Sequence, residues 1–160
     1  MRKTPFFVAE ISANHLNSLE RAHQLIEAAF QAGADAVKLQ TYTPDTMTLD
    51  LVQNSVSPDH ELWGGKSLYE LYSEAMTPWE WHKELFEHGK RLGITVFSSP
   101  FDRSAVDFLE ELNCPMYKIA SLETGDLDLI GYVASKRKPI IISTGASTLL
   151  EIEEAVEAVG

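Results

Sequence analysis

The chain has 160 residues, of which 24 are acidic and 13 are basic, giving a formal net charge of −11. This charge disfavours attraction to nucleic acid or to anionic lipid, so we expect no nucleic-acid partner and no membrane. The hydrophobic fraction of 44% is typical of a globular domain. The single cysteine, Cys114, has no partner for an internal disulfide, and the apolar run Phe6–Ala9 is too short for a signal peptide. The sequence therefore predicts a cytoplasmic protein.

Short runs of β-branched and aromatic residues recur along the chain and predict five strands. The runs are Phe6–Ala9, Ala36–Leu39, Ile94–Phe97, Met116–Ile119 and Ile140–Ile142. Each run is followed by a polar loop and then by apolar residues at helical spacing, so strands alternate with helices. Alternating βα units form a parallel sheet, either doubly wound or closed as a barrel. The sequence has no glycine-rich dinucleotide motif and no Walker loop, which disfavours a nucleotide-binding doubly wound fold.

Helix start signals precede each predicted helix. The apolar spacing from Ala22 onwards predicts a helix over Ser18–Gln31, and Thr77-Pro78-Trp79-Glu80 has the capping-box pattern of a helix that ends at Gly93. The remaining helix starts are predicted at Asp102, Asp126 and Thr148.

The second interval between predicted strands is about twice as long as the others, because residues 42–76 form an insertion. We predict a short helix within it, around Lys66–Ala75. Long loops in compact domains are often functional lids or binding loops, although an ordinary surface or subunit-contact excursion accounts equally well for the length.

Polar residues gather where the predicted strands end. In parallel α/β folds the ligand lies at the carboxyl ends of the strands, so these positions are the candidate site. They are Glu10, Ser12, Asn14 and His15; Lys38, Gln40 and Thr41; Ser98 and Ser99; Lys118, Ser121 and Glu123; and Ser143 and Thr144.

Lys38 and Lys118 lie within otherwise apolar strands, where an unpaired ammonium group is costly to desolvate. Period-two alternation places Lys38 and Gln40 on one face, from which both can meet Lys118. Together with the hydroxyl groups, the lysines indicate a small phosphorylated or carboxylated metabolite. Two alternatives remain open: each lysine pairs with a structural acid, or one of them forms a Schiff base as in class I aldolases.

Glu10, Glu123 and His15 are the candidate catalytic residues, because each follows a strand at a point where a substrate can reach it. A structural ion pair between Glu123 and Lys118 is the alternative for that acid. The five histidines show no metal-ligand spacing, so we expect no metal site made wholly by this chain. We interpret the histidines other than His15, and also Cys114, as surface or packing residues.

Five stretches at these strand ends resemble the sialic acid synthase family. They are Ala9-Glu10-Ile11-Ser12-Ala13-Asn14-His15, Gly33-Ala34-Asp35-Ala36-Val37-Lys38-Leu39-Gln40-Thr41, Phe97-Ser98-Ser99-Pro100-Phe101, Tyr117-Lys118-Ile119-Ala120-Ser121 and Ile142-Ser143-Thr144-Gly145. The Ser-Ala-Asn-His form and the segments 41–49 and 68–82 are most similar to the pseudaminic acid synthase branch. Ser99, where relatives commonly have threonine, and Leu122, in place of a small residue, argue against N-acetylneuraminate synthase.

The resemblance implies a (βα)8 TIM barrel of which about five βα units are present, so that residues 1–160 are its N-terminal part. It implies a phosphoenolpyruvate pocket formed by Lys38, Ser99, Lys118, Ser121 and Ser143, with Glu10 and Glu123 near the reacting carbons. Asn14, His15 and Gln40 would line the same mouth.

The implied reaction condenses phosphoenolpyruvate with an amino sugar aldehyde, adds water and releases phosphate. The resemblance further implies a divalent metal (Mn²⁺ or Mg²⁺) whose histidine ligands lie on later strands, a C-terminal antifreeze-like domain and a homodimer. We expect neither the metal ligands nor that domain within these 160 residues, and we expect the isolated chain to be inactive. A non-catalytic sugar-phosphate binding module remains a further alternative.

Overall fold

Five parallel strands form one sheet in the computed structural model, which describes residues 5–51 and 64–160. The strands are β1 (Val8–Glu10), β2 (Ala36–Thr41), β3 (Thr95–Pro100), β4 (Tyr117–Ile119) and β5 (Ile140–Ile142). Their order in the sheet is their order in the chain. A doubly wound sheet reverses its strand order at a switch point, whereas a barrel does not, so this sheet is half of a barrel. The predicted strands and the predicted barrel class are confirmed.

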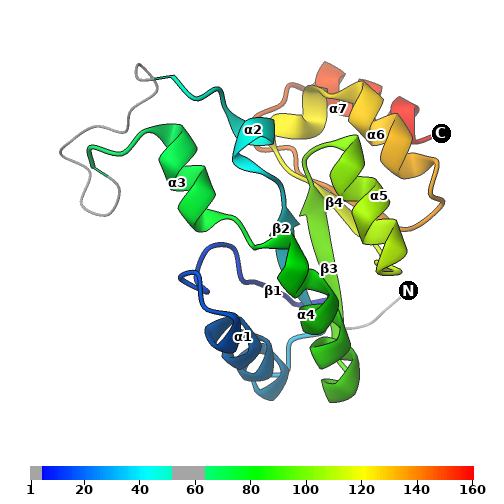
Figure 1. Ribbon diagram of the computed structural model, residues 1–160. Coiled ribbons are helices and arrows are strands. Elements are labelled where there is room, and N and C mark those ends of the chain that lie inside the picture. Colours follow the sequence, from blue (N-terminus) through cyan, green and yellow to red (C-terminus); the bar gives the residue numbers. More distant parts are fainter. Residues whose placement is uncertain (1–4, 52–63) are drawn as a thin grey trace.

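Helices follow the strands and cover the outside of the curved sheet (Figure 1). They are α1 (Leu19–Gln31), α4 (Trp79–Leu92), α5 (Arg103–Glu111), α6 (Leu127–Ala134) and α7 (Leu149–Val159). The predicted caps Ser18, Asp102, Asp126 and Thr148 each accept a hydrogen bond from the backbone N–H three residues on. None of the helices in the described parts of the chain is both long and apolar enough to span a membrane.

The capping box predicted at the start of α4 is wrong. The helix begins at Trp79, so the residue at the cap position is Pro78, which has no side-chain donor or acceptor. Thr77 lies one residue further out and is buried, and its hydroxyl group is 3.3 Å from Nε2 of His15. The threonine therefore links two segments of the chain instead of capping a helix.

The insertion at residues 42–76 contains α2 (Pro44–Met47) and α3 (Leu68–Ala75), while its residues 52–63 lie outside the described part. The helix predicted around residues 66–75 is confirmed as α3, with a capping box between Ser67 and Glu70. Figure 1 shows α2 just beyond the carboxyl end of β2, with α3 further to the left. The insertion is anchored there, because Thr46 in α2 donates a hydrogen bond to Asp102 over 2.8 Å.

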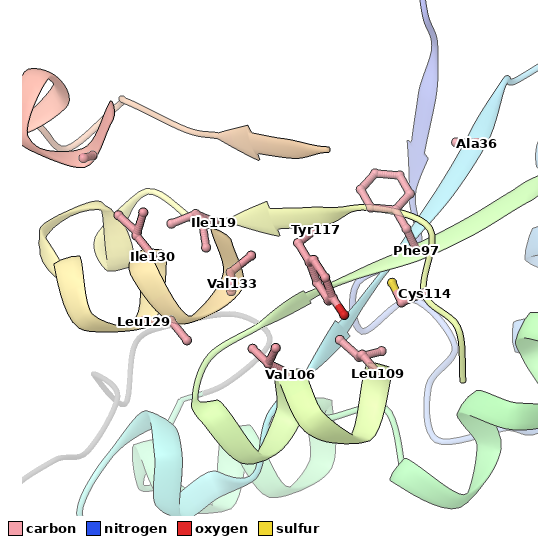
Figure 2. Packing of buried hydrophobic residues seen from close by; sticks show 11 residues of the cluster. Ala36, Phe97, Val106, Leu109, Cys114, Tyr117, Ile119, Leu129, Ile130 and Val133 are labelled. Atoms are coloured by element: carbon pink, nitrogen blue, oxygen red, sulfur yellow. The ribbon is translucent and has the colours of Figure 1, made fainter. Parts of the chain in front are cut away.

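The apolar core lies between the sheet and the helices. One cluster joins β4 to α5 and α6, and Figure 2 shows Tyr117 directed toward Leu109 of α5 and Ile119 toward Val133 of α6. A second cluster packs α1 and α4 against β2 through buried residues such as Ile26 and Leu85. Most of the outer face of the sheet is therefore apolar, whereas Lys38 and Gln40 lie on the inner face, opposite Phe97 and Ser99 in the strand register.

The helix α4 approaches the sheet closely at Gly89. A Cβ atom added there would collide with Cγ2 of Val96 in β3 and lie 3.1 Å from the carbonyl oxygen of Ile94. We predict that Gly89→Ala lowers the free energy of unfolding by about 1–3 kcal/mol, because a stiff valine and the backbone must shift. Denaturant unfolding followed by circular dichroism measures this change.

Gly131 in α6 provides the matched control, since a Cβ atom there would have only an ordinary contact, 3.8 Å from the carbonyl oxygen of Ala158. Gly131→Ala should raise stability by roughly 0.5–1 kcal/mol through helix propensity. Equal effects of the two substitutions would contradict the close approach of α4 to β3.

Candidate active site at the strand ends

The register of the strands decides which polar side chains share the inner face. Glu10 pairs with Lys38, and Gln40 pairs with Ser99. On β4, Lys118 alternates with Tyr117, which belongs to the outer core, so Lys118 also lies on the inner face. The two lysines and Gln40, which the sequence predicted to meet at one face, do share that face.

Lys38 forms an ion pair with Glu10, and its Nζ lies 3.4 Å from Oγ of Ser99. The Lys38 side chain is only 14% exposed, whereas that of Glu10 is 40% exposed. The other carboxylate oxygen of Glu10 accepts a hydrogen bond from the backbone N–H of Ser12. The hydroxyl group of Ser12 lies 3.4 Å from the side-chain oxygen of Gln40, so the ends of β1 and β2 are connected.

Lys118 occupies a partly buried position beside these groups. Burial lowers its pKa, and the neighbouring Lys38 ammonium lowers the pKa further, while Glu10 and Glu123 oppose the shift. The Nζ of Lys118 donates a hydrogen bond to the carbonyl oxygen of Ile119 over 2.5 Å. Among the described residues, Lys118 therefore has carboxylates within electrostatic range and a neutral acceptor as its direct partner.

Glu123 lies in η1 (Leu122–Gly125), the short 3-10 helix that follows β4. Its Oε2 atom is buried and has no hydrogen-bond partner among the described residues. Burial raises the pKa of Glu123. A carboxyl group whose pKa is raised holds its proton to higher pH than an exposed one does, which favours a role as proton donor.

Ser121 and Ser143 lie at the ends of β4 and β5. The hydroxyl oxygen of Ser121 accepts a hydrogen bond from the backbone N–H of Ala146 over 2.8 Å. The carbonyl oxygen of Ser143 accepts a hydrogen bond from the buried hydroxyl group of Thr124 over 2.6 Å. Thr124, which the sequence analysis did not single out, thus joins η1 to the end of β5.

The side-chain contacts of His15 and Asn14 are with groups other than the two lysines. The Nδ1 atom of His15 accepts a hydrogen bond from the backbone N–H of Asn17, and its Nε2 faces Thr77. The His15 ring is fully buried and stands edge-on to Trp81, and burial lowers its pKa. The side-chain amide of Asn14 donates to the carbonyl oxygen of Ile11. Both residues hold the loop between β1 and α1, and their predicted roles at the mouth stay predictions.

A buried polar network lies on the outer face, directly behind the site. The Thr41 hydroxyl oxygen lies 2.8 Å from Nε2 of His82 and 2.7 Å from the hydroxyl oxygen of Ser98. The Nδ1 atom of His82 lies 3.2 Å from the carbonyl oxygen of Pro78. All three side chains are fully buried. His82 was expected to be a surface or packing residue, and only tertiary structure brings it to the strand ends.

The described residues contain no group of three or more His, Cys, Asp or Glu side chains that could hold a metal ion. The donors present at the strand ends are two ammonium groups, several hydroxyl groups and backbone N–H groups. Such a set matches an anion with phosphate or carboxylate oxygens. The half-barrel and its strand ends define a TIM-barrel domain whose inner face carries two lysines and several hydroxyl groups.

Comparison with known proteins agrees with this class. Residues 25–160 match the NeuB family, and the chain belongs to that family. It is 50% identical over 156 residues to the pseudaminic acid synthase of Helicobacter pylori and 35% identical to the N,N'-diacetyllegionaminic acid synthase of Legionella pneumophila. The solved N-acetylneuraminic acid synthetase of Leptospira borgpetersenii superposes with a TM-score of 0.83 at 26% identity.

These alignments cover nearly all of this chain but only part of each relative. The alignment with the Helicobacter protein covers 98% of this chain and 46% of that protein. The alignment with the Legionella protein covers 98% of this chain and 44% of that protein. In the Leptospira structure, 96% of this chain matches 49% of the solved chain. The sialic acid synthase resemblance is confirmed, including its greater similarity to the pseudaminic acid synthases.

The buried histidine behind the site makes stability depend on pH. Burial lowers the pKa of His82 to about 4, against hydrogen bonds to neighbouring backbone and attraction to Glu80 that raise it. The unfolded chain takes up this proton near pH 6.5, whereas the folded chain does so only near pH 4. We predict that the stability contributed by neutral His82 is full above pH 6.5 and falls by about 3 kcal/mol on acidification to pH 4.

Urea unfolding of the full-length protein between pH 7.5 and pH 4 checks this prediction when it is compared with the His82→Gln variant. The variant lacks the titrating ring, so its stability should depend less steeply on pH. Carboxylates titrate in both proteins, and the difference between the two curves isolates His82. Identical pH dependence in both proteins would contradict a neutral, buried imidazole.

Proposed function

We propose that this chain carries the phosphoenolpyruvate-binding part of a nonulosonic acid synthase of the pseudaminic acid type. Such an enzyme condenses phosphoenolpyruvate with an amino sugar aldehyde to form a nine-carbon acid and releases phosphate. The observation that carries the proposal is the placement of Lys38 and Lys118 on one inner face, with Ser99 beside Lys38. The 50% identity to a pseudaminic acid synthase supports the choice of branch over an N-acetylneuraminate synthase.

Phosphoenolpyruvate carries a phosphate group and a carboxylate on the same carbon, C2, so cationic groups are needed for both. In our proposal Lys38 and Lys118 supply these, and hydroxyl groups from Ser99, Ser121 and Ser143 complete the set of donors. The ion pair of Lys38 with Glu10 would loosen as substrate oxygens take the ammonium group. Ammonium groups fixed in a partly buried site bind charged substrate more strongly than solvent-exposed ones do.

The reaction then proceeds in steps that balance. The C3 carbon of phosphoenolpyruvate attacks the aldehyde carbon of the open-chain sugar, a carbon–carbon bond forms, and the aldehyde oxygen takes a proton. Water adds at C2 and loses one proton, and C2 then carries a hydroxyl group and the phosphate ester. The C–O bond to phosphate breaks, the remaining hydroxyl proton passes to the departing phosphate, and a 2-keto acid is left. In our proposal Glu123, whose pKa burial raises, donates the first proton. Glu10 is the candidate to accept the proton of water, and Gln40 would contact the sugar.

A divalent metal, Mn²⁺ or Mg²⁺, is part of the proposal for the whole protein, with ligands outside this chain. When bound, it would polarise the sugar aldehyde. The residues described here bind the anion and move protons. A homodimer, in which a C-terminal domain of the partner covers the site, and a cytoplasmic location belong to the same proposal.

A class I aldolase is the second candidate, favoured by one observation. The pKa of Lys118 is lowered by burial and by Lys38, and a neutral amine is the form that attacks a carbonyl group. Several donors around two lysines favour anion binding instead. Borohydride trapping of a substrate on Lys38 or Lys118 would identify the aldolase.

Neutralising either lysine tests the anion site. We predict that Lys38→Met and Lys118→Met each weaken phosphoenolpyruvate binding by roughly 10- to 100-fold, because each removes a charge-assisted hydrogen bond. Isothermal titration of the full-length protein measures the dissociation constants. Lys136→Met is the matched control, because Lys136 pairs with the exposed Asp107 on the helical side and should not affect binding. Unchanged affinity in both lysine variants would refute the assignment.

The extent of the chain generates a separate prediction. Because residues 1–160 match less than half of the Helicobacter synthase, we expect the isolated chain to form little or no product. An assay with Mn²⁺, phosphoenolpyruvate and the diacetamido sugar, read out as phosphate release, checks this. The full-length protein in the same assay is the positive control. Rapid product formation by the 160-residue chain would show that this half of the barrel suffices.

A further inference from the structure

The inner-face donors at the ends of β2 and β3 are each adjacent in sequence to a residue of the buried network. Gln40 precedes Thr41, and Ser99 follows Ser98, so the side chains alternate between the site and the outer face. Gln40 and Ser99 are also partners in the register of the two strands. Any movement of Thr41 or Ser98 relative to the other therefore moves the donors that face the substrate.

The contact with Pro78 sets the direction of the hydrogen bonds in the network. The carbonyl oxygen of Pro78 can only accept, so Nδ1 of His82 must carry the proton and donate it. The Nε2 atom is then an acceptor for the Thr41 hydroxyl group, which in turn accepts from Ser98. The lowered pKa of His82 agrees with a neutral ring. One tautomer thus fixes three fully buried side chains.

The network is also tied to the insertion. His82 stands edge-on to Phe108, which stacks on Trp79 with ring centroids 4.8 Å apart. The indole N–H of Trp79 donates to the carbonyl oxygen of Tyr42, where the insertion begins. The first residue of the insertion and the start of α4 are therefore held together behind the site. The contacts through Trp79 and Phe108 thus connect Tyr42 to His82.

From these contacts we propose that His82 is a positioning residue of the active site, which acts through Thr41 and Ser98 to hold the ends of β2 and β3 in register. This inference rests on the proposed function for its effect on substrate, but not for its effect on the strands. Its consequence is that the meeting of Lys38 with Ser99 depends on a histidine that never touches the ligand. Side chains of similar shape that lack the hydrogen-bonding groups should preserve the fold but make the ends of β2 and β3 more mobile.

Three variants separate hydrogen bonding from packing. Thr41→Val keeps the shape of the side chain and removes the hydroxyl group, and His82→Phe keeps a ring against Phe108 and removes both nitrogen atoms. His82→Gln restores an acceptor for the Thr41 hydroxyl group. Val133→Ala is the stability control, because it removes buried volume from α6 and leaves the network untouched.

Two measurements on the full-length protein test the proposal. We expect Thr41→Val and His82→Phe to weaken phosphoenolpyruvate binding by about tenfold, the loss typical of a buried hydrogen bond, and His82→Gln to recover part of it. Amide hydrogen exchange in peptides covering residues 36–41 and 95–100 should become faster in the first two variants. Val133→Ala should lower stability without changing phosphoenolpyruvate affinity.

The proposal is overturned if folded Thr41→Val and His82→Phe proteins bind phosphoenolpyruvate as the unmodified protein does, whatever their exchange rates. It is also overturned if Val133→Ala weakens binding equally, since the effect would then be general destabilisation. If the unmodified protein does not bind phosphoenolpyruvate, the proposed function fails. Faster exchange confined to the two strand ends would then still support positioning by His82, and unchanged exchange would overturn it.

Discussion

Two lysine ammonium groups on the inner face of a parallel sheet are the constraint around which the rest of this structure is arranged. An unpaired charge there is costly, and two like charges in range of each other raise the cost. Glu10 pairs with Lys38, and the field of Glu10 and Glu123 partly offsets the burial of Lys118. The compensation is incomplete within the described residues, because the direct partner of Lys118 there is the carbonyl oxygen of Ile119 and its pKa is lowered. Binding of an anion would complete it.

The sheet can carry this charge because its outer face packs against helices through large apolar side chains. On the outer face Tyr117, Ile119 and Leu39 pack against helices, and this burial supplies the stability that the polar inner face does not. The outer face also holds a polar network, but there every member is satisfied by another buried group. Polar groups that bond to one another in the core fix geometry. Polar groups on the inner face that can still form further hydrogen bonds would be available to a ligand.

Much of the fold could be predicted because its signals are local. Strand runs, caps at Ser18, Asp102, Asp126 and Thr148, and the stop at Gly93 depend on residues within a few positions of one another. The same local pattern failed at Thr77, because a distant residue, His15, takes its hydroxyl group. A capping motif makes a local hydrogen bond favourable, but a tertiary hydrogen bond of similar free energy can replace it.

The site divides in the same way. The sequence by itself determined that Lys38, Gln40, Ser99 and Lys118 stand at strand ends, because period-two alternation and the βα order place them there. It could not determine strand order, the pairing of Glu10 with Lys38, or the role of His82. These depend on which strands lie side by side and on contacts between residues far apart in the chain, such as Thr41 with His82 and Ser98. Long-range pairing has no local signal in the sequence, so only the tertiary structure decided it.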